Sequence, residues 1–299
     1  AGLCGRGFDV QAGGYISTDT RWGLPDYGKY INNTYVDSGK YKKNTYVKDG
    51  VIHVGDVDND KDTTVRKYYR EKETGYEEIR WIVSESENYW QVKDKNGTIR
   101  TYGRKANSWN GIDAKQKYTW YLNEERDVHG NTITYDYIQY GNDNYIYLKS
   151  IAYTGYKNEI GPYKVNFNYI DRKDARLDGR GKFVSKQGKL LTDVWIGYVD
   201  AKETRELRSY FFDQEFNELG FTQLKAFGQR IKVDGEKKQV FYKYSFDYYM
   251  PERDEATGCY KIFVKVLDKA PDWKLDLGVQ VTESVSAGVE GSASVGAGF

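Results

Sequence analysis

Short runs of residues in which aromatic or β-branched side chains alternate with polar ones recur along this chain, separated by turn-forming residues. Residues 89–94 and 98–103 form two such runs on either side of Asn96-Gly97. Two alternating runs around Asn-Gly are a strong hairpin signal, because this pair accepts the positive φ angles of a type I′ turn. A period of two directs alternate side chains to opposite faces of a strand. The pattern therefore predicts antiparallel β-structure.

The aromatic content of the chain favours the same fold class. The 299 residues include 29 Tyr, 12 Phe and 7 Trp but only one Met. Strands favour aromatic and β-branched residues, and a tyrosine can bury its ring while its hydroxyl stays in water. We therefore expect broad sheets with one face partly exposed to solvent.

Further alternating runs allow a prediction of the architecture. A second hairpin is expected around residues 127–131, and the best helical candidate is 201–208. Turn signals about 8–12 residues apart favour a sandwich, barrel or extended sheet over βαβ units. The fold class predicted is all-β, a large antiparallel domain of stacked hairpins that forms a partial β shell or a sandwich, with little helix. The runs expected to be strands lie at 46–48, 51–54, 78–83, 120–122, 132–137, 145–153, 163–169, 190–198, 205–213, 220–227, 240–249 and 261–267.

A change in composition divides the chain into two parts. Residues 1–250 read as the β-rich domain, and 251–299 as a linker followed by a segment rich in Gly, Ala and Ser. Val279, Val281, Val285 and Val289 lie at odd positions of that segment. Three interpretations stay open for it: a flexible linker, a strand that leads into a further domain, and a membrane-inserting hairpin arm. We expect the chain to be a fragment of a longer polypeptide.

Charge and cysteine content narrow the classes of partner. The chain has 45 basic and 44 acidic residues, a formal net charge of +1. This balance gives no long-range field that would collect nucleic acid or anionic lipid, so we expect neither partner. Cys4 and Cys259 are far apart in the sequence, and spacing leaves open whether they form a disulfide or remain thiols.

Candidates for metal binding and acid–base chemistry are few. Four carboxylates alternate at Asp56, Asp58, Asp60 and Asp62, and alternating oxygens in a loop can hold calcium. The glycine and glutamate of an EF-hand loop are missing, so these residues are a weak calcium candidate and no cofactor is predicted. The two histidines are isolated: His53 lies in an expected strand and His129 in an expected turn, so neither is predicted to act in catalysis.

Several motifs in one order resemble the SpvB/TcaC family of bacterial toxin components. The first is the glycine-rich opening, Gly5-Arg6-Gly7-Phe8, in which Phe8 stands where that family has Trp. The other segments that carry the resemblance are 13–17, 21–27, 33–39, 90–103, 120–137, 147–153 and 165–169. The resemblance is to the SpvB-like N-terminal region of toxin-complex B components and extends over about residues 5–250.

This resemblance implies a structural role. In the family, the region precedes a β-propeller and tyrosine-aspartate (YD) repeats, and it contributes to a hollow β shell that encapsulates a C-terminal toxic polypeptide. The chain is therefore expected to be a non-catalytic module of a secreted bacterial toxin. Its partners would be the downstream Rhs/YD-repeat shell and the pore-forming toxin A component, with no membrane contact by this fragment.

The ADP-ribosyltransferase of SpvB lies in a separate C-terminal domain, and this chain does not match that domain. Glu71-Lys72-Glu73 and Glu85-Ser86-Glu87 contain the Glu-x-Glu pair of such enzymes. The chemistry also needs an upstream Arg and a Ser-Thr-Ser strand, in an order and spacing that this chain lacks. No catalytic residue is therefore predicted, and the chain is not expected to be an enzyme.

The alternative function is a carbohydrate-binding or adhesive surface module. Rows of exposed tryptophans on a sheet stack on sugar rings, and Trp22, Trp90, Trp109 and Trp120 are the candidates for such a row. The competing interpretation places these side chains in the core.

Overall fold

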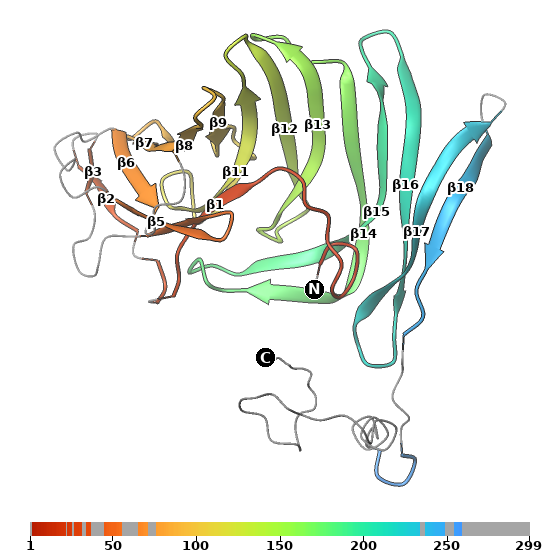
Figure 1. Cartoon of the computed structure of the whole chain (residues 1–299). Coiled ribbons are helices and arrows are strands. Elements are labelled where there is room, and N and C mark those ends of the chain that lie inside the picture. Colours follow the sequence, from red (N-terminus) through yellow and green to blue (C-terminus); the bar gives the residue numbers. More distant parts are fainter. Residues whose placement is uncertain are drawn as a thin grey trace, which may run out of the picture. The chain divides into compact units, whose positions relative to one another are not determined.

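The structure is a computed structural model that describes residues 2–21, 23–25, 27–31, 34–36, 45–55, 65–70, 76–233, 237–248 and 254–258. The chain divides into two compact units, Ala1–Phe246 and Asp247–Phe299. All strands of the described residues lie in the first unit (Figure 1). The division into parts 1–250 and 251–299 stays a prediction, because residues 259–299 lie outside the described part of the chain.

The described residues form strands and contain no helix, which confirms the all-β fold class. The strands are β1 (Tyr15–Thr18), β2 (Lys29–Ile31), β3 (Thr34–Val36), β4 (Tyr46–Lys48), β5 (Val51–Gly55), β6 (Val65–Arg70), β7 (Glu78–Val83), β8 (Asn88–Lys93), β9 (Ile99–Tyr102), β10 (Trp109–Gly111), β11 (Lys117–Arg126), β12 (Asn131–Gln139), β13 (Ile146–Tyr156), β14 (Tyr163–Asp178), β15 (Ser185–Val199), β16 (Thr204–Phe216), β17 (Thr222–Val233) and β18 (Lys237–Ser245).

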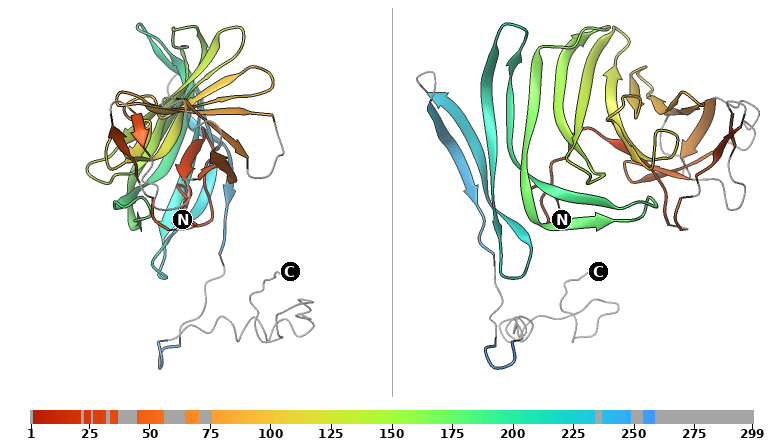
Figure 2. Two further views of the ribbon diagram at one scale, coloured as in Figure 1. Left: turned by 90° about the vertical axis from the view of Figure 1, so that its left-hand side faces the viewer. Right: turned by 180° about the vertical axis from the view of Figure 1, so that it is seen from behind.

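A closed ring of strands forms one end of the first unit. The antiparallel order β1-β4-β5-β6-β7-β8-β9-β11 returns to its start, because β1 pairs with both β4 and β11. A barrel of this size has an interior just wide enough for side chains to fill. The ring therefore has no free edge and encloses a packed core (Figure 2).

Strand β11 belongs both to the barrel and to a long open sheet. Its first half pairs with β1, from Tyr15↔Tyr121 to Ser17↔Thr119, and closes the ring. Its second half pairs with β12 through Glu124↔Thr134 and starts a meander that runs in order from β12 to β18. Strand β14 has 16 residues, a contour length of roughly 50 Å at about 3.3 Å per residue. The longest strands of the open sheet are thus much longer than the strands of the barrel (Figure 2).

Three hairpin connections share one turn geometry, in which a side-chain oxygen organises the loop. The Asp94 carboxylate accepts a hydrogen bond from the Asn96 N–H at 2.9 Å, and the Gly97 N–H donates to the Asp94 carbonyl at 3.0 Å. The turns that start at Asp127 and Asn217 repeat this pattern, with a glycine at positive φ three residues later. This is the type I turn followed by a left-handed glycine, which is common in three-residue hairpin loops.

The hairpin predicted at Asn96-Gly97 is present, but its type I′ turn is not. Only Gly97 has a positive φ, at 85°, because the Asp94 side chain draws the preceding residues into a type I turn. The two-residue turn with positive φ at both central positions is Asp49-Gly50 instead, at 51° and 77°, between β4 and β5. Asp-Gly is a strong signal for that turn.

The helical candidate at residues 201–208 is wrong. The Asp200 carboxylate accepts hydrogen bonds from the Lys202 and Glu203 N–H groups at 2.7 and 2.9 Å, and this turn leads directly into β16. Leu207 is half exposed in that strand, so the segment offers no apolar stripe for a helix to bury. The strand expected at 205–213 is confirmed as part of the longer β16.

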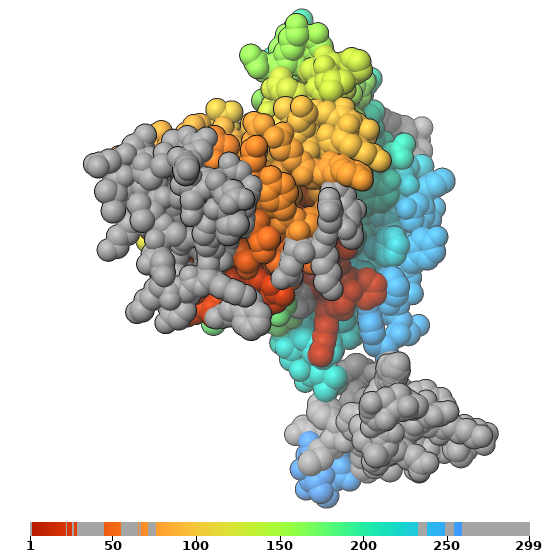
Figure 3. Space-filling view, turned by 60° about the vertical axis from the view of Figure 1, so that its left-hand side comes forward, coloured from red at the N-terminus to blue at the C-terminus, as the bar shows by residue number. Residues whose placement is uncertain are grey.

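An N-terminal segment, residues 2–10, lies across the open sheet. The segment and the sheet together enclose a second hydrophobic core, beside that of the barrel. Leu3 accepts a backbone hydrogen bond from Leu191, and the Arg6 N–H donates to Thr222. Phe8 packs against Phe246 with ring centroids 5.2 Å apart. In Figure 3 this segment, in red, lies between the orange barrel strands and the blue strands β17 and β18. We call residues 2–10 the strap. The residues of this second core are Cys4, Phe167, Leu191 and Leu224, with Leu3, Phe8, Val10, Leu148, Ile151, Val165, Tyr169, Val194, Phe212, Phe227 and Phe246 packed around them.

Candidate functional site: the barrel, its mouth and the open sheet

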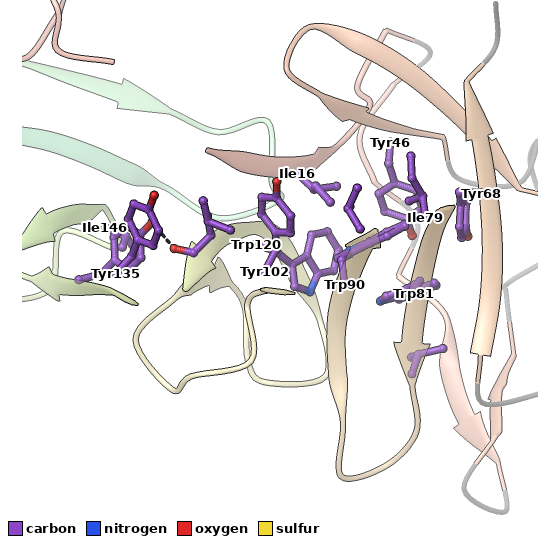
Figure 4. Packing of buried hydrophobic residues seen from close by; sticks show 14 residues of the cluster. Ile16, Tyr46, Tyr68, Ile79, Trp81, Trp90, Tyr102, Trp120, Tyr135 and Ile146 are labelled. Carbon is purple, nitrogen blue, oxygen red and sulfur yellow. Dashed lines mark hydrogen bonds between the residues drawn. The ribbon is translucent and has the colours of Figure 1, made fainter. Parts of the chain in front are cut away.

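The centre of the barrel is filled by aromatic rings (Figure 4). Trp81 and Trp90 stack with centroids 5.6 Å apart, and Trp120 meets both edge-on. Asn88 Oδ1 accepts hydrogen bonds from Trp81 Nε1 and from Trp120 Nε1, each at 3.0 Å. A single amide thus orients two rings, and the ring packing leaves no channel at this level of the barrel.

This packing decides where the tryptophans proposed for sugar binding lie. Trp90 and Trp120 are 0% and 1% exposed, so they are core residues and do not form a sugar-stacking row. Trp109 is half-buried in β10, with the Lys117 ammonium 5.0 Å from its ring centroid. Trp22 lies outside the described residues. The core interpretation is confirmed for Trp90 and Trp120.

Lys117 is a buried ammonium group at the junction of four strands, and the sequence analysis did not single it out. Its Nζ donates to the backbone carbonyl of Asn88 at 2.6 Å and to that of Gly103 at 2.9 Å. Burial lowers the pKa of Lys117 to about 7. The side chain thus links β11 to β8, to the end of β9 and, through Trp109, to β10, and no acidic side chain of the described residues pairs with it. A single lysine in an alternating strand carries no pattern that would have revealed this role.

The two histidines lie as predicted. His53 is 2% exposed in β5, with Nδ1 2.9 Å from the Val51 carbonyl oxygen. Burial lowers its pKa, and the nearby charges of Lys48 and Arg70 act in the same direction. His129 is exposed in the β11–β12 turn, where its N–H donates to the Asp127 carboxylate. Neither ring faces a carboxylate or hydroxyl with which it forms a hydrogen bond in the described structure.

The carboxylate motifs predicted from the sequence fall partly inside and partly outside the described residues. Glu85 and Glu87 lie in the exposed β7–β8 turn and form surface ion pairs with Lys115 and Arg104, at 3.2 and 3.7 Å. The pair at residues 71–73 and the weak calcium candidates at 56–62 lie outside the described residues. Within the described ranges, no group of three or more His, Cys, Asp or Glu side chains is arranged to hold a metal ion.

A polar pocket opens at one mouth of the barrel, and we call it the mouth pocket. It has a volume of about 210 Å³. Lys48 Nζ donates to Asp49 Oδ2 at 2.8 Å, and Arg100 Nε donates to Glu125 Oε2 at 2.6 Å. Tyr102 reaches the pocket from β9 and is 3% exposed. The residues that line the pocket are Gly13, Gly14, Lys48, Asp49, Arg100, Tyr102, Leu122, Glu125 and Tyr135.

Electrostatics at this mouth are dominated by buried, paired charges. Burial raises the pKa of Glu77, but hydrogen bonds from Arg70 and Lys48 outweigh it and hold the pKa below its usual value. Burial raises the pKa of the Tyr102 phenol, and the negative charge of Asp49 adds to the effect. The phenol of Tyr102 is therefore neutral at neutral pH, beside the ion pairs Lys48–Asp49 and Arg100–Glu125.

A buried ion pair holds a corner in the β14–β15 hairpin. The pairing register shifts between Asp171 and Arg176, and Arg172, whose side chain is 0% exposed, lies in this bulge. Arg172 Nε donates to Asp174 Oδ1 at 3.1 Å, and Asp174 also accepts from the Thr222 N–H and hydroxyl at 2.9 and 2.7 Å. Burial opposes ionisation of Asp174, but these hydrogen bonds lower its pKa well below the usual range.

The strap places Cys4 in the second core. Cys4 is 2% exposed, and burial, with a smaller effect of the Asp9 charge, raises the pKa of its thiol to about 12. Cys259 lies outside the described residues, so the possible disulfide stays a prediction. The thiol of Cys4 behaves here as a small core side chain, inert at neutral pH.

The outer part of the open sheet is largely exposed outside the second core. In β16 only Ser209 and Phe211 are buried among thirteen residues. Ion pairs cross the neighbouring strands, as between Arg230 and Asp193 at 2.8 Å. Among the described strands β18 pairs only with β17, and its Phe241 is 66% exposed. The sheet thus ends in a strand that has an unpaired edge within the described structure. A search of the described residues finds no helix of the length and hydropathy needed to cross a bilayer.

The family model of SpvB, described as Salmonella virulence plasmid 65kDa B protein, matches residues 1–175. This match extends over more than half of the chain, so the chain belongs to the SpvB family. The resemblance inferred from its motifs is confirmed. No curated protein matches the chain.

Solved structures share the fold. The N-terminal domain of effector protein SpvB from Salmonella typhimurium strain LT2 has a TM-score of 0.63 and 16% identity, over 74% of this chain and 88% of that one. The TcdB2-TccC3 crystal structure has a TM-score of 0.66 and 11% identity, over 81% of this chain and 14% of that one. The Photorhabdus luminescens Tc holotoxin pore gives 0.64 and 11%, over 79% and 14%. The chain therefore spans a small part of the Tc polypeptides that it matches.

Proposed function

We propose that this chain is a non-catalytic structural module of a secreted bacterial toxin. It forms part of a hollow β shell that encapsulates a C-terminal toxic polypeptide, and it links this shell to a propeller or YD-repeat region. The observation that carries the proposal is the open sheet β12–β18. Outside the second core its outer strands are largely exposed and joined by ion pairs, and its last strand pairs on one edge only among the described strands.

These features suit a wall better than a self-contained core domain. A wall that surrounds an unfolded cargo needs a half-polar inner surface, because a strongly apolar one would trap the cargo. Further strands that pair with β18 would extend the wall and remove the exposed edge. The filled barrel gives the wall a rigid end, because a ring of strands has no edge of its own.

Membership in the SpvB family supports this role. The fold of the chain recurs within the TcdB2-TccC3 and Tc holotoxin structures, where it makes up 14% of each matched chain. From this we propose the partners: a downstream Rhs/YD-repeat shell and a pore-forming toxin A component. Secretion from a bacterium follows from the same proposal, which assigns no catalytic residue and no cofactor.

Limited proteolysis with mass spectrometry, applied to the full natural polypeptide that contains this segment, tests the proposal. The expected result is one large resistant particle that retains the barrel and the open sheet and also shields a C-terminal piece. Release of this segment alone, as a compact soluble fragment with no protected cargo, would overturn it.

A matched pair of variants sharpens the experiment. Phe241→Lys puts a charge on the outer strand β18, where Phe241 is 66% exposed, and should open the wall and expose the cargo to protease. Val128→Lys changes a side chain of similar exposure, 65%, in the β11–β12 turn, away from the edge. If the two variants digest alike, closure does not depend on β18.

A further inference from the structure

The mouth pocket contains a polar group without a partner. Tyr102 is 3% exposed, and its hydroxyl makes no hydrogen bond within the described structure. The hydroxyl is not one of the buried polar atoms that lack a partner in the described residues, so it is accessible from the pocket. An accessible hydroxyl can exchange a hydrogen bond to water for one to a ligand. A hydroxyl on a pocket wall is therefore poised to bind a molecule in that pocket.

The charges around Tyr102 favour a neutral ligand over a charged one. Two cations, Lys48 and Arg100, and two anions, Asp49 and Glu125, line the pocket, and each cation is already paired with an anion. A charged ligand would have to break one of these pairs. A hydroxyl group both donates and accepts, so a neutral ligand with several hydroxyls can use carboxylate and ammonium groups together while both pairs stay intact.

Size and shape restrict the ligand further. A volume of about 210 Å³ equals the share of about seven water molecules at about 30 Å³ each. This is below the range of about 300–1,000 Å³ typical of pockets for drug-sized molecules. Tyr102 and Tyr135 are 3% and 7% exposed, so the pocket offers polar groups rather than a ring face on which a ligand could stack.

A glycine in the wall, Gly14, keeps the pocket open. The Gly14 carbonyl accepts a hydrogen bond from Leu122 at 2.8 Å, which fixes the backbone at the pocket wall. A Cβ added at Gly14 would lie 3.8 Å from both Asp49 Oδ1 and Tyr102 Cε1, so larger side chains at this position would extend among the lining groups. The φ of Gly14 is not in the left-handed region, so the backbone itself accepts a substitution.

We propose that the mouth pocket binds one neutral, polyhydroxylated ring, a monosaccharide or the terminal sugar of a glycan. The site is separate from the buried Trp90 and Trp120, and the proposal is independent of the shell role. Lys48, Arg100, Asp49 and Glu125 contact the sugar hydroxyls, and Tyr102 donates to a ring substituent.

Saturation-transfer NMR and calorimetry on the intact chain test this proposal, with glucose, galactose, mannose and N-acetylglucosamine as neutral probes and sialic acid as the charged probe. At least one neutral sugar should bind with a Kd near or below about 1 mM, and sialic acid should bind at least tenfold more weakly. If all neutral probes fail to saturate, or sialic acid binds best, the proposal is overturned.

Three variants locate the binding. Tyr102→Phe removes only the unpartnered hydroxyl and should raise the Kd about tenfold, and Gly14→Val should abolish binding by filling the pocket. Gly179→Val is the control, because Gly179 does not line the pocket and a Cβ there meets no atom within 4 Å. Circular dichroism confirms the fold of each variant. If sugar binding is unchanged in both Tyr102→Phe and Gly14→Val, the sugar does not bind in the mouth pocket.

A glycan array with the same proteins distinguishes the two sources of the sugar. Retention of glycans that end in the preferred neutral sugar, lost in Tyr102→Phe, assigns a terminal glycan residue. Binding of the free sugar with no retention on the array assigns a free monosaccharide. Glycan retention that persists in Tyr102→Phe overturns the assignment of this pocket.

Discussion

The barrel and the open sheet are built from the same kind of hairpin but reach stability by different means. In the barrel, a closed ring buries large rings such as Trp90 and Trp120 to 0% and 1% exposure. In the open sheet, β16 buries two of thirteen residues, and ion pairs such as Arg230–Asp193 cross its faces. A closed sheet encloses its own hydrophobic core. The open sheet is instead covered in part by the strap, is held at the Arg172–Asp174 corner and, in our proposal, is continued by further strands.

The largest effect is expected in the barrel core. Trp90→Ala removes a fully buried ring that touches Trp81, Trp120, Tyr46 and Tyr68, and should lower the free energy of unfolding by about 3–5 kcal/mol. Chemical denaturation followed by circular dichroism measures the change. A loss below about 1 kcal/mol would mean that the barrel does not depend on its aromatic core.

The next effect is expected at the corner of the open sheet. Asp174→Asn leaves the Arg172 guanidinium buried without its carboxylate and should cost about 3 kcal/mol at pH 7. Asp171→Asn is the control, because the Asp171 side chain is 89% exposed and solvent screens its pair with Lys189, so the loss of stability should be much smaller.

Asp174 also makes the stability of the open sheet depend on pH. The pKa of Asp174 is lower in the folded state than the ordinary value of 3.8, so its stabilising effect is present above that value and is lost as the pH falls below it. Urea unfolding between pH 5 and pH 2.5 should show a fall in stability that is smaller in Asp174→Asn, in which other carboxylates with lowered pKa values, such as Glu77, still titrate. A parallel fall in both proteins contradicts this assignment.

A third effect separates the barrel from the sheet by the pH range in which it occurs. Burial lowers the pKa of Lys117 from 10.5 to about 7, so between these values the unfolded chain binds more protons. The unfolding free energy should therefore rise between pH 7 and pH 9, by up to about 1.4 kcal/mol per pH unit. In Lys117→Met this rise should disappear. A rise of equal slope in the variant would assign the effect to other groups.

The smallest effect is expected at the outer edge. Phe241→Lys should change the unfolding free energy of the isolated chain by less than about 0.5 kcal/mol, because Phe241 is 66% exposed. Denaturation beside Trp90→Ala measures the contrast. A loss above about 2 kcal/mol would show that β18 already has a covered outer face in the isolated chain.

The strands were predictable from the sequence because alternation is a local property. The run at 78–83 is confirmed as β7 with the bounds that the pattern indicated. Strands β14 and β15 are longer than predicted, 16 and 15 residues, because charged residues on their wet faces interrupt the pattern without ending the strand. The turn type at Asn96-Gly97 was missed because the Asp94 side chain decides it.

The mouth pocket and the barrel closure were not predictable from the residues alone. The pairing of β9 with β11 places Arg100 beside Glu125, and the pairing of β1 with β4 and β11 brings Gly14 and Asp49 to them. Lys117 and Arg172 are ordinary surface residues by type, and tertiary contacts bury them. Such long-range pairing leaves no mark in a local pattern.

Hydrogen–deuterium exchange at β18 tests the central claim, that the open sheet is a wall completed by further strands. In the isolated chain, the β18 amides should exchange fastest among the strands and those of β8 and β11 slowest. In the full toxin polypeptide, β18 should become protected by at least tenfold. Equal and fast exchange of β18 in both proteins would contradict the claim, because the wall would not continue from this edge.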